Sequence, residues 1–442
     1  MQSFFCRSIL AIAALAIAAL LHAEQSLVDN QTDSLISSHK IVYIDGKRAD
    51  AGTQAYVDSI RDEISRFYYD QFRHFQDPAA PYFLFMSRDA GLAMGIGGCV
   101  RMRGYYDWGG AIPASGFAPA LIPMNPSPTD MRHLGTTPAG TSLYFRVIGS
   151  NKALGEYQLY IECNFNGYQS RDFHLKKAYA MINDFTVGYA NSTFSDPAAL
   201  PPTVDAQGPN NKISPTSVLL RYMPVIRNRW TLAVSAETPE TTIMPRDDKQ
   251  SAAVSDWMPD FAGFVQYQWG RTEHVRLAGI LRTLPYRNLE RQSNHNVVGW
   301  GVQLSSVAHP LKELTTYVLA NYGHGIPSIC GDMMIASYDL LAKPGSPGEM
   351  YAPRSFGWCL GLQYNFRPNL FMSVCASQMR YLPKGAVEPS TYKYGLFGAV
   401  NVFWNLTPRM QVGAEFDLGM RRDFSHARRT AKRVGAMCQF SF

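Results

Sequence analysis

Apolar and polar residues alternate along most of the chain from residue 93 to its end. From Glu156 to Phe165, for example, odd-numbered positions are apolar and even-numbered positions carry polar groups. The same two-residue period recurs over Trp230–Glu237 and Gln411–Leu418. Because successive side chains of a β-strand point to opposite faces, this pattern predicts strands with one apolar and one polar face.

The pattern predicts sixteen strands, and the lengths of their connections alternate. The strands are expected at 93–107, 140–149, 154–166, 171–182, 184–194, 213–223, 229–237, 258–269, 273–284, 296–308, 313–323, 355–366, 369–380, 394–405, 408–420 and 430–442. Every second joint is short and turn-like, whereas the longest joints are 108–139, 195–212, 238–257 and 324–354. Alternating short turns and long loops are typical of an up-and-down barrel in a bacterial outer membrane.

The start of the chain predicts export. Residues 1–23 contain Arg7, an apolar run over 9–21 and a small residue, Ala23, after which we expect cleavage of a signal peptide. Outside this run the sequence has no second apolar stretch of comparable length. An exported chain without further apolar runs is soluble or crosses the outer membrane as a barrel.

A periplasmic segment, 24–92, is expected between the signal peptide and the barrel. Its first part, 24–52, is polar, and 53–77 has the apolar spacing of an amphipathic helix. That helix has two interpretations, self-association with other copies or docking on its own barrel. The predicted fold class is therefore all-β: a 16-stranded antiparallel transmembrane β-barrel, 93–442, preceded by a short periplasmic helix.

The end of the chain and its composition agree with this fold. Residues 434, 436, 438, 440 and 442 form one apolar face that ends in Phe442, as the last strand of bacterial outer-membrane barrels does. Charged residues make up only 17% and aromatic residues 12% of the chain, which excludes a disordered protein. The six cysteines beyond the signal peptide are irregularly spaced, and we interpret them chiefly as small apolar residues.

A barrel of about sixteen strands is too wide for side chains to fill, so it encloses water. Strand parity directs several mid-strand arginines into this lumen, because an arginine facing lipid would cost about 2–4 kcal/mol. These candidate solute-binding residues are Arg101, Arg103, Arg146, Arg221, Arg276 and Arg282. Guanidinium groups grip carboxylates, which favours an arginine-bearing constriction. The alternative is that they pair with inward-facing acids, Glu156, Glu162, Glu237, Glu415 and Asp417, and stiffen the wall.

The connection 195–212 is rich in proline, aspartate and glycine. Because prolines reduce the entropy lost when a loop is held in place, this loop suits an inward-folded constriction. An ordinary surface loop is the alternative.

Two stretches resemble the DcaP-like outer-membrane porin family. Residues 193–209 are similar to its segment F-x-D-P-x-x-L-P-x-T-x-D-x-x-G-P, and 92–107 resemble its first strand, with a Gly-Gly pair and a final Tyr-Asp. The resemblance implies a sixteen-stranded homotrimer, a preceding periplasmic helix and passage of small anionic solutes such as dicarboxylates. It also implies a constriction-loop role for Phe194, Asp196, Pro197, Leu200, Pro201, Thr203, Asp205, Gly208 and Pro209.

The sequence thus predicts a passive, anion-selective porin in the outer membrane of a Gram-negative bacterium. Its partners would be membrane lipid, two further copies of the chain and small anions, with no nucleic acid. No metal-binding, cofactor-binding or hydrolase motif is found in the sequence, so we expect no enzyme, metal or cofactor. The alternative is a structural or adhesive surface barrel without transport, in which the long loops bind other molecules.

Overall fold

The computed structural model describes residues 40–43, 83–86, 92–151, 153, 155–166, 171–226, 229–243, 250–270, 272–385 and 387–442. Sixteen strands form a closed antiparallel barrel, as expected. They are β3 (Leu92–Trp108), β5 (Ser142–Asn151), β6 (Gly155–Asn166), β7 (Asp172–Ile182), β8 (Phe185–Asn191), β9 (Thr216–Tyr222), β11 (Trp230–Glu237), β13 (Asp260–Gln268), β14 (His274–Asn288), β15 (Ser293–Leu311), β16 (Leu314–His324), β19 (Arg354–Arg367), β20 (Leu370–Leu382), β21 (Tyr392–Asn405), β22 (Met410–Asp423) and β23 (Arg428–Ser441).

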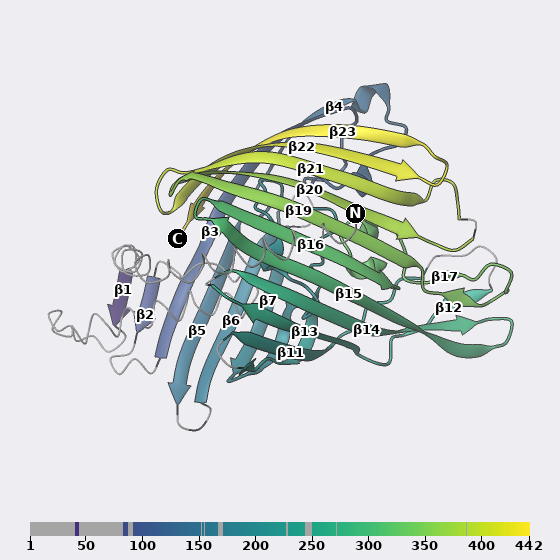
Figure 1. The fold of residues 1–442 in the computed structure, drawn as a ribbon, viewed down its shortest axis with the longest axis horizontal. Coiled ribbons are helices and arrows are strands. Elements are labelled where there is room, and N and C mark those ends of the chain that lie inside the picture. The colour runs from purple at the N-terminus through teal and green to yellow at the C-terminus, as the bar shows by residue number, and fades with distance from the viewer. Residues whose placement is uncertain are drawn as a thin grey trace, which may run out of the picture.

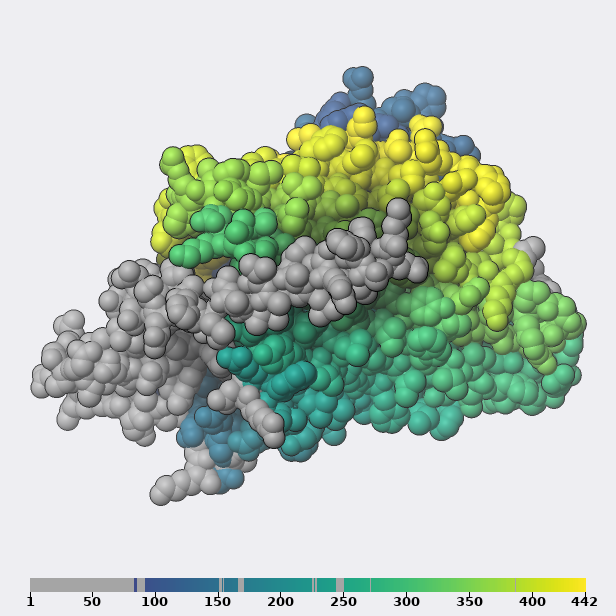
Figure 2. Space-filling view, in the orientation of Figure 1, coloured from purple at the N-terminus to yellow at the C-terminus, as the bar shows by residue number. Residues whose placement is uncertain are grey.

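The barrel closes where its last strand meets its first. β23 runs antiparallel to β3, with Arg433 opposite Asp107 and Ser441 opposite Cys99. Figure 1 shows β19–β23 side by side at a slant to the long axis, with β23 beside β22 near the top, and β3 and β5 running more steeply at the left. In the space-filling view of Figure 2, the green and yellow strands of the C-terminal half form most of the visible wall.

The two faces of each strand differ as the alternation predicts. Along β14, Arg276, Ala278 and Ile280 are buried on the inner face. Leu277 and Leu281, on the outer face, are 59% and 58% exposed. The outer face is therefore an apolar surface suited to lipid, and the polar side chains face inward.

The wall is not equally high all round. β8, β9 and β11 have 7, 7 and 8 residues, whereas β14 and β15 have 15 and 19. A strand that crosses a bilayer usually needs about 9–11 residues. One arc of the barrel is thus lower than the rest.

The long connections carry short elements that the alternation did not predict. The expected loop 108–139 contains β4 (Arg132–Thr137), which pairs with the second half of β3 and raises the wall there. The first loop also contains the 3-10 turns η1 (Pro119–Leu121) and η2 (Pro128–Asp130). β12 (Ser251–Ala253) lies in the connection after β11 and pairs with β14.

The connection after β16 holds η5 (Pro327–Ile329), α4 (Met333–Ala336), β17 (Leu341–Ala342) and β18 (Met350–Tyr351). β12 and β17 lie at the same end of the barrel, to the right in Figure 1. Conversely, β14 and β15 extend further than expected, so only Leu289–Gln292 separate them.

Two short strands precede the barrel where none was expected. β2 (Phe83–Met86) pairs with residues 93–96 of β3, and β1 (Lys40–Tyr43) runs parallel to β2. Since β23 pairs with residues 99–108 of β3, β2 covers the strand edge that β23 leaves open.

β10 (Val225–Ile226) is a short hairpin partner of β11.

The expected signal peptide and the helix over 53–77 lie outside the described residues. Within the described part of the chain, no helix has the length and hydropathy needed to cross a bilayer. The six cysteines 99, 163, 330, 359, 375 and 438 are free thiols.

Candidate functional site

The connection between β8 and β9, loop 192–215, forms hydrogen bonds with inner-face side chains of many strands. Its first anchor is Asp196, in contact with β14 and β15. One carboxylate oxygen lies 2.9 Å from His274 Nε2 and 2.5 Å from Ser305 Oγ. The other lies 3.6 Å from the guanidinium of Arg276. Burial alone would raise the pKa of Asp196, but Arg276 and His274 hold it well below its usual value.

The ring of His274 faces oxygen atoms on both sides. Its Nε2 is directed at Asp196, and its Nδ1 lies 2.8 Å from the carbonyl oxygen of Thr272. Since both neighbours are acceptors, both contacts are hydrogen bonds only when the ring carries two protons. The first anchor therefore combines a carboxylate with one guanidinium and one imidazole.

The middle of the loop contacts several strands, partly through its backbone. η4 (Pro197–Ala199) forms one short turn, capped by Leu200. Pro201 packs against Gly361 of β19. A Cβ at position 361 would lie only 2.6 Å from the Cβ of Pro201. The carbonyl of Pro202 then accepts hydrogen bonds from Ser373 of β20 and Asn401 of β21, at 2.7 and 2.9 Å.

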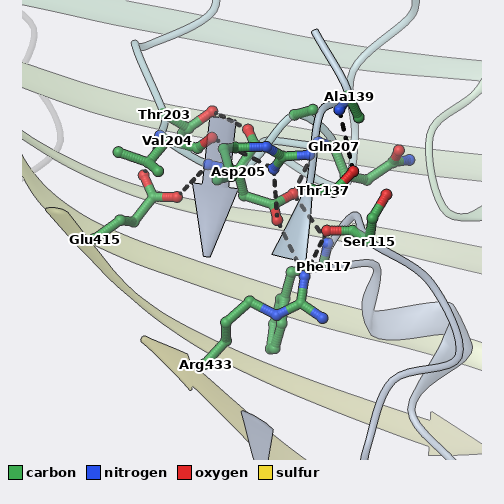
Figure 3. Close-up of polar contacts among 12 residues, drawn as sticks. Ser115, Phe117, Thr137, Ala139, Thr203, Val204, Asp205, Gln207, Glu415 and Arg433 are labelled. Atoms are coloured by element: carbon green, nitrogen blue, oxygen red, sulfur yellow. Dashed lines mark hydrogen bonds and ion pairs between the residues drawn. The ribbon is translucent and has the colours of Figure 1, made fainter. Parts of the chain in front are cut away.

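The tip of the loop is held by charged side chains of β22, β23 and β3 (Figure 3). Glu415 of β22 accepts the backbone N–H groups of Val204 and Asp205 at 2.7 and 2.6 Å. The carboxylate of Asp205 lies 3.2 Å from Arg433 and 3.5 Å from Arg103. Hydrogen bonds to charged groups are worth about 1.5–3 kcal/mol each, so this cluster fixes the tip firmly.

Two further connections also contribute to the tip and the return of the loop. The backbone N–H of Phe117, in the first loop, donates to Asp205 at 2.9 Å. On the return path, Asn210 donates to Asp332 in the connection after β16, at 3.0 Å. The carbonyl of Asn211 accepts from Asn321 of β16, also at 3.0 Å.

The remaining loop residues singled out from sequence stabilise the loop by apolar packing and by local hydrogen bonds. Phe194 is buried in an apolar cluster with Ile280 and Ile326. The hydroxyl of Thr203 donates to the carbonyl of Asp205 at 2.8 Å. Gly208 has a φ of +61°, a left-handed conformation that glycine adopts without strain. The carbonyl of Pro209 accepts from the N–H of Lys212 at 3.2 Å.

The six arginines singled out by parity contact different kinds of group. Arg103 and Arg276 contact acids of the loop, and Arg282 contacts Asp260 and Asp339 at 2.9 and 3.3 Å. Arg101 donates to the carbonyl of Val204 at 2.9 Å.

The other two arginines lie on β9, in the low arc, and on β5, which β6 and β7 separate from that arc. Arg221 of β9 donates to the hydroxyl of Thr193 at 2.8 Å and to the carbonyl of Asn191. Arg146 of β5 lies over the ring of Tyr160, with Cζ 5.2 Å from the ring centre. Three of the six arginines thus contact carboxylates, whereas the contacts described for the other three are with carbonyl, hydroxyl or aromatic groups.

The sequence reasoning missed two features of the inner face. Arg433 forms a bidentate pair with Asp107, at 2.6 and 2.9 Å, and it lies in phase with the inward positions of β23, which could have revealed it. The second feature is the packing of Tyr144, Tyr160 and Tyr179 into one buried cluster on the inner face of β5, β6 and β7. Parity places such rings on the inner face but does not show that they pack together.

The comparisons with known proteins agree with this fold. No family model and no curated protein sequence matches the chain. The outer membrane channel DcaP of Acinetobacter baumannii matches in structure with a TM-score of 0.70, over 81% of this chain and 99% of that one, at 17% identity. An anion-selective porin from Comamonas acidovorans matches with a TM-score of 0.52, over 79% of this chain and 100% of that one, at 10% identity. The resemblance to the DcaP-like porins is therefore confirmed in the fold, and the chain has the sixteen-stranded barrel of outer-membrane channel proteins.

Proposed function

We propose that the protein is an outer-membrane porin through which small anionic solutes, dicarboxylates among them, diffuse passively. The observation that carries this proposal is the closed sixteen-stranded wall with a polar inner face. A barrel of this strand number leaves a water-filled lumen. The structural neighbours are channels and porins, which supports passive transport as the function.

In this proposal loop 192–215 narrows the lumen. Its support is the path of the hydrogen bonds, which lead from Asp196 at β14 to Asp205 at β23 and β3 and return to Asn211 at β16. A segment tied to inner-face side chains of so many strands occupies part of the lumen's cross-section. Its two carboxylates, Asp196 and Asp205, pair with Arg103, Arg276 and Arg433, so these arginines serve mainly to hold the loop.

We attribute the preference for anions to the formal charge of +6 of the whole chain. Arg146, Lys177 and Arg221, which are buried on the inner faces of β5, β7 and β9, contribute to that charge. Guanidinium groups stay charged at every physiological pH and bind carboxylates. A cationic face in a narrow aqueous channel raises the local concentration of anions.

We further propose that the low arc of the barrel packs against other copies of the chain in a homotrimer. A seven-residue strand is about 23 Å long and, tilted by about 40°, spans about 18 Å. This is less than the apolar band of about 25 Å that a barrel presents to lipid. The arc is nevertheless apolar outside, since Val187, Val218 and Leu220 are 54%, 58% and 56% exposed. In the trimer, a neighbouring subunit would cover these residues. We also propose that the N-terminal segment, 24–92, lies in the periplasm.

Conductance measurements test the proposal. The full-length mature protein, reconstituted in planar bilayers, should conduct in three equal steps, and a KCl gradient should give a reversal potential of the anion-selective sign. Arg146→Gln should lower the anion preference, whereas Arg287→Gln, which removes the same charge near the end of β14, should not. A folded barrel without conductance would contradict the porin function, and a cation-selective one would contradict the solute class alone.

A further inference from the structure

Three arginines lie close together on the outer face of the last four strands of the barrel. Arg380 of β20 pairs in register with Tyr394 of β21, Tyr394 pairs with Arg422 of β22, and Arg422 pairs with Arg428 of β23. Each arginine is in phase with an exposed apolar residue of its own strand, which are Val374, Phe416 and Val434. Arg380, Arg422 and Arg428 are here called the outer arginine row.

The outer arginine row lies at one edge of the apolar band that would face lipid. On β21 the outward positions between Tyr394 and Trp404 are occupied by leucine, glycine and two valines. These two aromatic residues are ten positions apart, which in a strand tilted by about 40° corresponds to a height of about 26 Å. Outer-membrane barrels have an apolar band of about 25 Å between two aromatic girdles. Tyr394 therefore marks a membrane–water interface, where an outward arginine costs little.

This interface is on the side of the longer connections. On that side residues 383–391 join β20 to β21, whereas at the other end residues 368–369 join β19 to β20 and residues 406–409 join β21 to β22. Short turns of outer-membrane barrels face the periplasm and longer loops face the outside. In the outer membrane, the outer arginine row would therefore lie at the outer leaflet.

Tyr394 orients two of the arginines without compensating their charge. The guanidinium carbons of Arg380 and Arg422 lie 5.0 and 5.9 Å from the centre of its ring, within the range of a cation–π contact. Arg422 also donates to the Tyr394 hydroxyl at 3.3 Å. Among the residues that the structure describes, no carboxylate lies within ion-pair distance of the outer arginine row. Asp423, the next residue of β22, faces inward and pairs with Arg421 at 2.9 Å.

The outer arginine row stays uncovered in the proposed trimer. β9, in the low arc, and β21 are eight strands apart in the closed ring of sixteen, so they lie on opposite sides of the barrel. A neighbouring subunit that covers the low arc leaves the outer faces of β20–β23 in contact with lipid.

We propose that the outer arginine row binds phosphate groups of lipopolysaccharide, the glycolipid of the outer leaflet, while its acyl chains contact the apolar band below. This binding is independent of the proposed channel function and requires only the outer-membrane location. Guanidinium groups bind phosphate through two parallel hydrogen bonds. Since neighbouring strands are about 4.8 Å apart, the row spreads over about 14 Å and can contact more than one phosphate.

Native mass spectrometry of the full-length mature protein in a neutral detergent tests this proposal, with lipid A as the probe. We expect lipid A with two phosphates to bind more tightly than the monophosphoryl form with the same acyl chains. The double substitution Arg380→Gln/Arg422→Gln should weaken binding of the first form about 30-fold, because each interfacial arginine contributes about 5-fold. The control Lys312→Gln/Arg367→Gln removes the same charge from exposed positions at the short turns and should leave binding unchanged.

The possible results separate this site from the channel function. Equal binding of lipid A by the parent protein and the Arg380→Gln/Arg422→Gln variant overturns the site, and so does equal binding of the two forms of lipid A. Displacement of lipid A by inorganic phosphate alone overturns the lipid as the occupant. A barrel that conducts but does not bind lipid A contradicts only the site, and one that binds but does not conduct contradicts only the channel. Should the double variant fail to fold, Arg428→Gln, at an exposed position, should weaken binding about 5-fold.

Discussion

At the scale of single residues, Arg433 joins three parts of the chain. Its guanidinium pairs with Asp107 of β3 and with Asp205 of the loop tip, and donates to the carbonyl of Ser115 at 2.8 Å. It also lies 4.0 Å from the ring centre of Tyr105. Since two buried carboxylates depend on it, its role is to compensate charge inside the barrel.

Arg433→Met should lower the free energy of unfolding by about 3–5 kcal/mol, because it leaves Asp107 and Asp205 without their shared cation. Urea unfolding in lipid vesicles measures this change. The exposed Arg428, near the start of the same strand, provides the control, and Arg428→Met should change stability by less than about 0.5 kcal/mol. Equal effects of the two substitutions would show that Arg433 does not hold the tip.

A second single residue, Asp332, makes the stability of the folded protein depend on pH. Burial raises its pKa to about 7, although Asn210 and Tyr392 both donate to its carboxylate at 3.0 Å. In the unfolded chain an aspartate has a pKa of about 3.9. The folded protein therefore keeps a proton that the unfolded chain has lost, and its stability falls as the pH rises from about 4 to about 7.

We expect the urea midpoint of the protein to be lower at pH 8 than at pH 5, and Asp332→Asn to reduce this difference. The asparagine still accepts from Asn210 and Tyr392 but has no charge to bury. Asp130→Asn, at an exposed position of η2, is the matched control and should leave the pH dependence unchanged. A difference that persists in full in Asp332→Asn would exclude this carboxyl as its source.

At the scale of elements, loop 192–215 is bonded near its start, at its tip and on its return path to side chains of the barrel strands, and we have proposed that it narrows the lumen. Replacing residues 197–210 by a short Gly-Ser linker removes its tip and its return path. Single-channel conductance should then rise several-fold, because the cross-section that the loop occupies becomes water-filled. Shortening the turn 344–348 between β17 and β18 is the control and should leave conductance unchanged. An unaltered conductance in the first variant would mean that the loop does not narrow the path.

The strands could be predicted from sequence, and much of the loop's role could not. Strands such as β22 have an apolar outer face and a polar inner face, so their side chains alternate over most of their length, as from Gln411 to Leu418. β2 and β4 are too short to show such a period, and they form because a free edge or face of β3 is available to them. The proline and aspartate content pointed to loop 195–212. The hydrogen bonds of this loop could not be predicted, because partners such as Asp196 and His274 lie 78 positions apart and meet only when the barrel is closed.

At the scale of the whole molecule, the formal charge is +6. Acids pair with arginines where the loop is attached, and the excess positive charge of the chain is the proposed source of the anion preference. We expect the proposed anion preference to weaken as KCl rises from about 0.1 M to about 1 M, because the screening length falls from about 10 Å to about 3 Å. Reversal potentials measured at a fixed concentration ratio test this. A preference independent of salt would contradict an electrostatic origin.

The junction of β3 and β23 also has a consequence for biogenesis. Gly98 and Phe442 exchange two backbone hydrogen bonds, at 2.9 and 3.0 Å, so the residue that follows β23 contributes to closing the ring. β23 lies more than 300 residues after its partner strand in the chain. Until β23 has been synthesised and exported, the edge of β3 that it covers is unpaired and prone to aggregation. A variant without residues 428–442 should therefore accumulate as an unclosed, protease-sensitive sheet.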